Sequence, residues 1–96
     1  MLIIELSYKK DLDEVNKHLN AHRDFLDVYY KKGIFFASGP KTPRTGGIIL
    51  TLADRHSIEN ILKDDPFYQH QIADFHITEF TPTKYSQAFK EAMLFD

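Results

Sequence analysis

The chain has 96 residues, no cysteine and a formal net charge of −2 at pH 7. This length accommodates one domain with one hydrophobic core, and the lack of cysteine excludes disulfides, thiolate metal sites and a cysteine nucleophile. The weak net charge and the scattered Lys and Arg residues argue against nucleic-acid and anionic-membrane partners. No segment approaches the about 20 apolar residues of a membrane span, and the N-terminus does not resemble a signal peptide. We therefore expect a cytoplasmic protein.

The first two elements are a strand and a long amphipathic helix. Residues 2–8 are rich in β-formers and predict a strand whose one side carries Leu2, Ile4, Leu6 and Tyr8. The helix is expected to begin after Asp11 or Asp13 and to end at Gly33. Apolar side chains recur in it every three or four residues, a spacing typical of one buried helix face: Leu12, Val15, Leu19, Phe25, Leu26, Tyr29 and Tyr30.

The next segment predicts a β-hairpin. Residues 34–38 and 48–52 have the composition of short strands, and residues 39–47 between them are rich in Gly and Pro, as in a loop. The third strand would place Ile48, Leu50 and Leu52 on one side of the sheet and Ile49 on the other.

The second half repeats a helix and a strand. Asp54 or Ser57 is expected to cap a helix whose apolar side carries Ile58, Ile61 and Leu62. Asp64-Asp65-Pro66 interrupts this helix because proline removes a backbone donor. Residues 67–72 favour another helical turn, and the alternation in 73–80 predicts a fourth strand with one face formed by Ala73, Phe75 and Ile77.

The order strand, helix, strand, strand, helix, strand predicts an α+β fold of the ferredoxin-like βαββαβ type. Its antiparallel sheet would carry both helices on one face. The apolar side chains of the third strand on the open face predict a homodimer formed through that face. We assign residues 1–84 to the domain and 85–96 to a C-terminal extension, expected to be helical from the spacing of Tyr85, Phe89 and Met93.

His22 falls in the seam of the first helix that should face the core. A titratable ring there costs desolvation free energy unless it finds a partner. It is a candidate general acid or base, and Asp65 is the candidate carboxylate that orients it. The alternatives are a partly buried histidine that donates to a carbonyl, and an aspartate that only caps the helix starting at Pro66.

The spacing of His18 and His22 would also allow both rings on one helix face, as in some zinc sites. A third ligand at Glu14 would start roughly 12 Å along the helix axis from His22. The glutamate of the zinc-protease motif is missing as well. We therefore expect no metal and no other cofactor.

The loop around residues 38–47 is a candidate substrate-binding segment. Its glycines allow close approach of the backbone, and the guanidinium of Arg44 could clamp a carboxylate or a phenolate. The spacing of a phosphate-binding loop is absent. The alternative is a rigid hairpin connection with one solvated arginine.

Several motifs occur in a fixed order: His22-Arg23-x-Phe25-Leu26, Gly33, Ser38-Gly39-Pro40, Gly46-Gly47, Asp65-Pro66-Phe67 and the closing segment Phe75 to Pro82. Together they resemble the YCII-related (YciI-like) family from Leu2 to about Lys84. The resemblance implies a domain that dimerises through its sheets, as in the dimeric α/β-barrel superfamily, and an active site built on a histidine and an aspartate, here His22 and Asp65.

The chain departs from the family pattern at one position. Many members carry an arginine three residues before the histidine, whereas this chain has Leu19. A substrate contact from that arginine is therefore not carried over, and we interpret Arg44 as a possible substitute.

We predict a small cofactor-free enzyme of the lyase or isomerase type that acts on a small carbonyl or ring compound. His22 would move the proton and Asp65 would fix its tautomer. The expected substrate-binding residues are Ser38, Gly39, Pro40, Arg44 and Phe67. The alternative is a non-catalytic domain that binds a small ligand or serves as an accessory domain. The predicted partners are a second copy of the chain and a small molecule.

Overall fold

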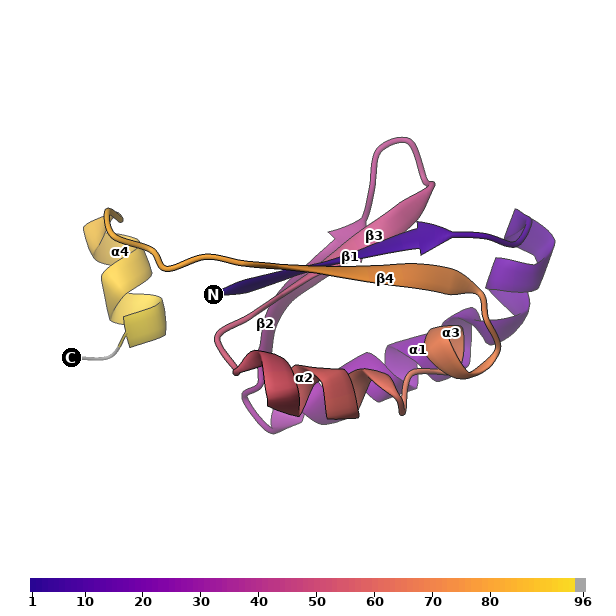
Figure 1. Ribbon diagram of the computed structural model, residues 1–96, viewed down its shortest axis with the longest axis horizontal. Coiled ribbons are helices and arrows are strands. Elements are labelled where there is room, and N and C mark those ends of the chain that lie inside the picture. Colours follow the sequence, from indigo (N-terminus) through magenta and orange to yellow (C-terminus); the bar gives the residue numbers. More distant parts are fainter. Residues whose placement is uncertain (95–96) are drawn as a thin grey trace.

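The computed structural model describes residues 1–94 and contains one four-stranded antiparallel sheet with the strand order β2-β3-β1-β4. Helices cover one face of this sheet (Figure 1). The elements in chain order are β1 (Leu2–Tyr8), α1 (Leu12–Lys31), β2 (Phe35–Pro40), β3 (Gly46–Thr51), α2 (Arg55–Leu62), α3 (Pro66–Gln69), β4 (Ala73–Glu79), α4 (Gln87–Phe89) and the π-helical turn η1 (Lys90–Leu94). This arrangement confirms the predicted ferredoxin-like α+β fold.

The helix ends follow the capping residues expected from the sequence. Asp11 accepts a hydrogen bond from the backbone N–H of Glu14 at the start of α1, and Gly33 follows its end with a φ of 73°. Glycine adopts this left-handed conformation without steric cost. At the start of α2, the Ser57 backbone N–H and hydroxyl donate to Asp54, and these hydrogen bonds lower the pKa of the Asp54 carboxyl.

The short helix α3 differs from the prediction of a turn over residues 67–72. It begins one residue earlier, at Pro66, because Asp65 caps it and proline suits the first helical position. It ends at Gln69 because Gln71 adopts a left-handed φ of 58° and the Ile72 N–H donates back to the Phe67 carbonyl, at 2.9 Å.

The hairpin between β2 and β3 is tighter than predicted. The Gly and Pro residues assigned to the loop at both ends join the strands, with Pro40 opposite Gly47. The Lys41 N–H donates to the Gly46 carbonyl at 2.9 Å and closes the turn. Proline is tolerated here because β2 is an edge strand. The connection therefore shrinks to residues 41–45.

A β-bulge interrupts the pairing of β2 with β3. Phe35 lies opposite Thr51 and Ala37 opposite Leu50, so the register shifts between Phe35 and Ala37. The extra residue reverses the side-chain alternation downstream. Ser38 therefore lies opposite Ile49, on the face of the sheet that the helices cover.

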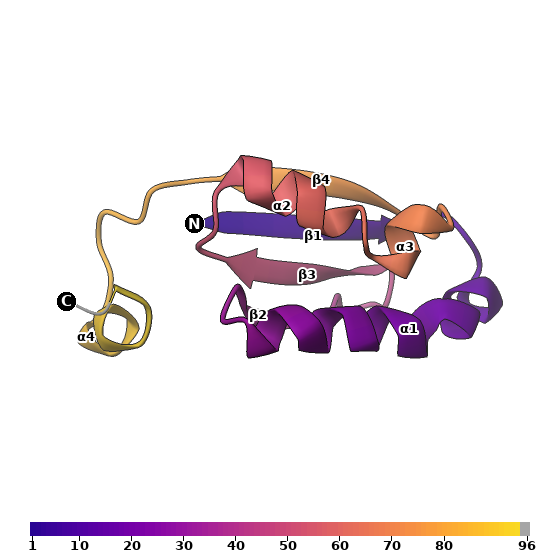
Figure 2. The same cartoon turned by 90° about the horizontal axis from the view of Figure 1, so that it is seen from below.

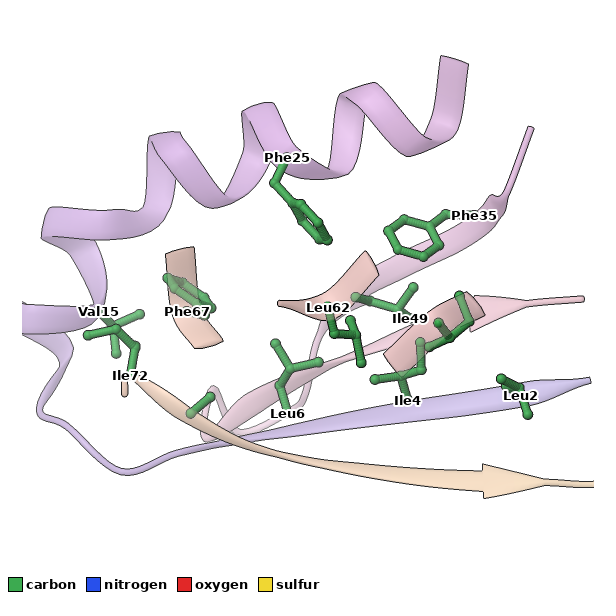
Figure 3. Packing of buried hydrophobic residues seen from close by; sticks show 12 residues of the cluster. Leu2, Ile4, Leu6, Val15, Phe25, Phe35, Ile49, Leu62, Phe67 and Ile72 are labelled. Carbon is green, nitrogen blue, oxygen red and sulfur yellow. The ribbon is translucent and has the colours of Figure 1, made fainter. Parts of the chain in front are cut away.

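The core lies between the sheet and the helices (Figure 3). The inward sides of β1, β3 and β4 follow the predicted alternation, and the buried apolar residues are Leu2, Ile4, Leu6, Val15, Phe25, Phe35, Ile49, Ile58, Leu62, Phe67, Ile72 and Ala73. Two predicted members of the buried face of α1 are instead exposed, Leu12 by 46% and Tyr30 by 36%. They lie near the two ends of α1, and its first turn extends past the end of β1 (Figure 1).

Among residues 1–94, no helix covers the opposite face of the sheet (Figure 1). The register places Ile3, Ile48 and Leu50 on this face, and all three are half-buried. Leu52, which the sequence also placed on this side, follows β3 and is 40% exposed. The alternation predicted for the third strand is thus confirmed.

The C-terminal extension projects beyond the sheet (Figures 1 and 2). It is helical from Gln87 to Leu94, and the rings of Tyr85 and Phe89 contact each other with centroids 5.7 Å apart. The side chain of Met93 and the last two residues of the predicted helix lie outside the described part of the chain. Within the described residues, no helix combines the length and apolar character that crossing a membrane requires.

Gly46 provides a test of the sheet. A Cβ atom on this residue would lie 1.7 Å from the Leu6 carbonyl oxygen in β1. Gly46→Ala must therefore push β3 away from β1, and we expect it to lower the free energy of unfolding by about 3 kcal/mol in urea denaturation. Gly39→Ala is the matched control, because a Cβ on Gly39 meets nothing within 4 Å. Equal losses in both variants would contradict this account.

Candidate functional site

His22 faces inward from the middle of α1, and its side chain is only 11% exposed. Its Nδ1 atom lies 2.8 Å from Oδ1 of Asp65, whose side chain is fully buried. The two residues are 43 positions apart in the chain and meet because α3 packs against α1. The structure thus brings together the histidine and the aspartate singled out from the sequence.

Asp65 has a second contact on the same oxygen. As the N-cap of α3, it accepts a hydrogen bond from the Phe67 backbone N–H at 2.9 Å on Oδ1. Its Oδ2 atom is buried and has no hydrogen-bond partner among the described residues. Leaving such an atom unpaired costs about 1–3 kcal/mol. Asp65 is therefore both the helix cap and the partner of His22, and the same atom, Oδ1, makes both contacts.

Phe67 fixes the plane of the imidazole. The rings of His22 and Phe67 are stacked with centroids 4.0 Å apart and an interplanar angle of 3°. Tyr8 meets the Phe67 ring edge-on at 6.0 Å. Figure 3 shows Phe67 beneath α1, at the end of the core where Val15 and Ile72 lie. The segment Asp65-Pro66-Phe67 thus supplies both the carboxylate and the aromatic surface that hold His22.

His22 borders a cavity of about 350 Å³ between α1, α3 and the β2–β3 hairpin. Its walls include all the predicted substrate-binding residues, Ser38, Gly39, Pro40, Arg44 and Phe67. Asp65 does not line the cavity and lies behind His22. Apolar side chains form much of the remaining wall: Leu6, Leu19, Leu26 and Ile49. A space of this volume accommodates a small organic molecule.

Polar contacts hold two of the wall residues in place. The Arg44 Nη2 atom donates to Oδ1 of Asn16 on α1, at 2.9 Å. The hydroxyls of Ser38 and Tyr30 lie 2.6 Å apart and share a hydrogen bond. The hairpin is therefore tied to α1 by one hydrogen bond from its loop and one from β2.

Sequence reasoning missed the position of Arg23, which also lines the cavity. The sequence pattern indicated this position only weakly, because a charged residue on an amphipathic helix usually lies on the solvated face. Its position next to His22 was the available hint. The contribution of Tyr30 was missed for a different reason, since the hydroxyl contact with Ser38 depends on the bulge in β2.

The other histidine on α1 has a different environment. The ring of His18 stacks on that of His70, with centroids 4.3 Å apart and an interplanar angle of 23°. Glu14 pairs with Lys17 at 2.8 Å, and this cation lowers the pKa of the Glu14 carboxyl. Within the part of the chain that the structure describes, no cluster of three or more His, Cys, Asp or Glu side chains could hold a metal ion.

Among solved structures, the chain is similar to 5-chloro-2-hydroxyhydroquinone dehydrochlorinase from Burkholderia phenoliruptrix, in its complex with 2,5-dihydroxybenzoquinone. The TM-score is 0.69, and the match covers 84% of this chain and 94% of the other. The sequence identity is 16%. The similarity at this identity concerns the fold.

No functionally curated protein matches the chain significantly. The model of the YCII-related domain matches residues 1–81, which include every element from β1 to β4 and all the residues that line the cavity. The C-terminal helical segment follows this region. The chain therefore belongs to the YCII-related domain family.

Proposed function

We propose that this protein is a small cofactor-free enzyme of the lyase or isomerase type that transfers a proton on a small carbonyl or ring compound. The observation that carries the proposal is the 2.8 Å contact between His22 and the fully buried Asp65, beside a cavity of about 350 Å³. A histidine held by a carboxylate at the edge of a cavity has the arrangement of a general acid or base. Its structural neighbour with the same fold is named as a dehydrochlorinase.

The hydrogen bond to Asp65 selects the tautomer of His22. The proposed mechanism uses Asp65 as an ionised carboxylate, which only accepts, so that Nδ1 carries the proton and Nε2 the lone pair in the neutral ring. Among the described residues, Nε2 has no hydrogen-bond partner. Asp65 Oδ2, and not this nitrogen, is the unpaired atom that is fully buried there, so Nε2 is accessible to a ligand. In the proposed reaction, Nε2 removes a proton from a substrate carbon or hydroxyl and returns it to another atom or to the leaving group.

Asp65 and Phe67 would both favour the protonated ring that forms during this transfer. The carboxylate of Asp65 faces the Nδ1–H, and burial strengthens this electrostatic interaction. The face of Phe67 lies 4.0 Å from the imidazole and attracts a cation through its quadrupole. Ser38 and Arg44 line the hairpin side of the cavity, and in this proposal they would bind an oxygen of the substrate.

Replacement of His22 tests the catalytic role. We expect His22→Gln to lower turnover by about 10²–10⁴-fold, the usual contribution of a general acid or base, while ligand binding persists. The assay is a panel of small carbonyl and ring compounds that begins with 5-chloro-2-hydroxyhydroquinone, with 2,5-dihydroxybenzoquinone as the binding probe. His18→Gln is the control, because that ring lies one turn away and stacks on His70. Turnover unchanged in His22→Gln would refute the role, and binding without turnover in the wild type would favour a ligand-binding domain.

Asp65→Asn separates the cap from the orienting role. Asparagine caps a helix as well as aspartate does, so α3 should persist, but the carboxylate acceptor is lost. We expect turnover to fall about 10²–10⁴-fold and the preference for a proton on Nδ1 of His22 to disappear, as read from its imidazole ¹⁵N shifts. Asp64→Asn is the matched control, because Asp64 is exposed and contacts the Tyr29 hydroxyl instead. An unchanged tautomer and rate in Asp65→Asn would leave Asp65 as a helix cap alone.

We further propose that the protein forms a homodimer through the open face of the sheet. Supporting this, Ile3, Ile48 and Leu50 form an apolar row on that face, beside the exposed Leu52. Burial of such a row against a second copy would remove it from water. The salt bridge between Lys41 and Glu5 lies on the same face, at 2.8 Å, and would form part of the polar surroundings of the interface.

The dimer is tested by a charge placed in that row. We expect the wild type to sediment as a dimer at micromolar concentration, and Leu50→Lys to sediment as a monomer with a lower Tm, because assembly and folding are coupled. Asn60→Lys adds the same charge on the exposed surface of α2 and should leave association unchanged. A wild-type monomer at this concentration would contradict the proposal.

A further inference from the structure

The lining of the cavity has one sign of charge. Two of its residues, Arg23 and Arg44, carry guanidinium groups, and none is Asp or Glu. The chain as a whole has the opposite balance, with 14 acidic and 12 basic residues. A cleft lined by one sign of charge focuses the electrostatic potential and concentrates ligands of the opposite sign.

Within the described part of the chain, neither guanidinium pairs with a carboxylate. The salt bridges there use Lys9, Lys17, His22, Lys41 and Arg55. Arg44 is exposed and donates to the neutral amide oxygen of Asn16, a contact that leaves its charge uncompensated. A guanidinium held in this way presents its remaining N–H donors to a ligand.

Both arginines are connected to α1, Arg23 as one of its residues and Arg44 through its hydrogen bond to Asn16. Asn16 and Arg23 are seven residues apart, which is about 10 Å along a helix axis and nearly two turns. Leu19 lies between them in the sequence and lines the cavity with an apolar side chain. Leu6, Leu26, Ile49 and Phe67 extend that apolar surface around the cavity.

We propose that the cavity takes a small apolar molecule that carries an anionic oxygen group, a carboxylate or an ionised enol or phenol, and that Arg23 and Arg44 supply the counter-charge. This inference rests on the same site as the proposed function and names its substrate class. Arg23 becomes a specificity-determining residue beside His22. A ligand bound there would place its charged end at the arginines and its apolar body against Leu19 and Phe67.

The test compares two planar probes of similar shape, benzoate and the neutral benzamide, by NMR chemical-shift titration at low ionic strength. We expect the wild type to bind benzoate at least about tenfold more tightly, the value of one charge-assisted hydrogen bond. Arg23→Gln and Arg44→Gln should each reduce this preference several-fold, and the double variant should abolish it. Arg44→Lys keeps the charge and should retain part of the preference.

Arg55→Gln is the matched control, because it removes the same charge from α2, where Arg55 pairs with Glu79. It should leave the preference for benzoate unchanged. Equal affinity for both probes, no binding of benzoate, or an equal loss in Arg55→Gln would each overturn the inference. The His22→Gln variant separates the two proposals, because it should lose turnover and keep the preference for benzoate. Charge preference without turnover refutes the reaction alone, and turnover without charge preference refutes this inference alone.

Discussion

The site depends on one carboxylate oxygen that forms two hydrogen bonds. Oδ1 of Asp65 accepts a hydrogen bond from the Phe67 backbone N–H, which starts α3, and lies 2.8 Å from Nδ1 of His22, which projects from α1. The same oxygen atom therefore caps the start of α3 and connects α3 to α1. These two hydrogen bonds also bring the ring of Phe67 onto His22, because the N–H that donates to the carboxylate belongs to Phe67 itself. Removing either partner from Oδ1 would leave a fully buried carboxylate with less compensation, which is costly.

The sequence pattern was sufficient for the fold, for reasons visible in particular residues. Strict alternation at Leu2, Ile4 and Leu6 identified the buried side of the sheet, and the capping aspartates marked the helix starts. The ends of the hairpin strands were missed because Gly39, Pro40, Gly46 and Gly47 resemble turn residues, although they continue the β2–β3 pairing. The local β-propensity of these residues does not predict where the strands end, because that depends on pairing with the neighbouring strand.

The site was predictable only in part. His22 was conspicuous as a ring in an apolar seam, and Asp65 as a residue before proline, and the family resemblance connected them. Local sequence alone could not show that capping and histidine contact use one oxygen, since that is a matter of three-dimensional geometry. The stack of His18 on His70 and the place of Arg23 at the cavity were hidden for the same reason. Contacts between residues distant in sequence leave little trace in local periodicity.

The bulge in β2 decides which atoms form one wall of the cavity. If the same residues paired with β3 without a bulge, the methyl group of Ala37 would lie opposite Ile49, in the place that Ser38 now occupies. The hydroxyl pair with Tyr30 would be lost at the same time. A shift of register by one residue therefore changes which side chain reaches this wall without any substitution in the strand. In related chains, the presence or absence of a bulge in this strand would therefore be a route to a new ligand preference, even where the residues of the strand are the same.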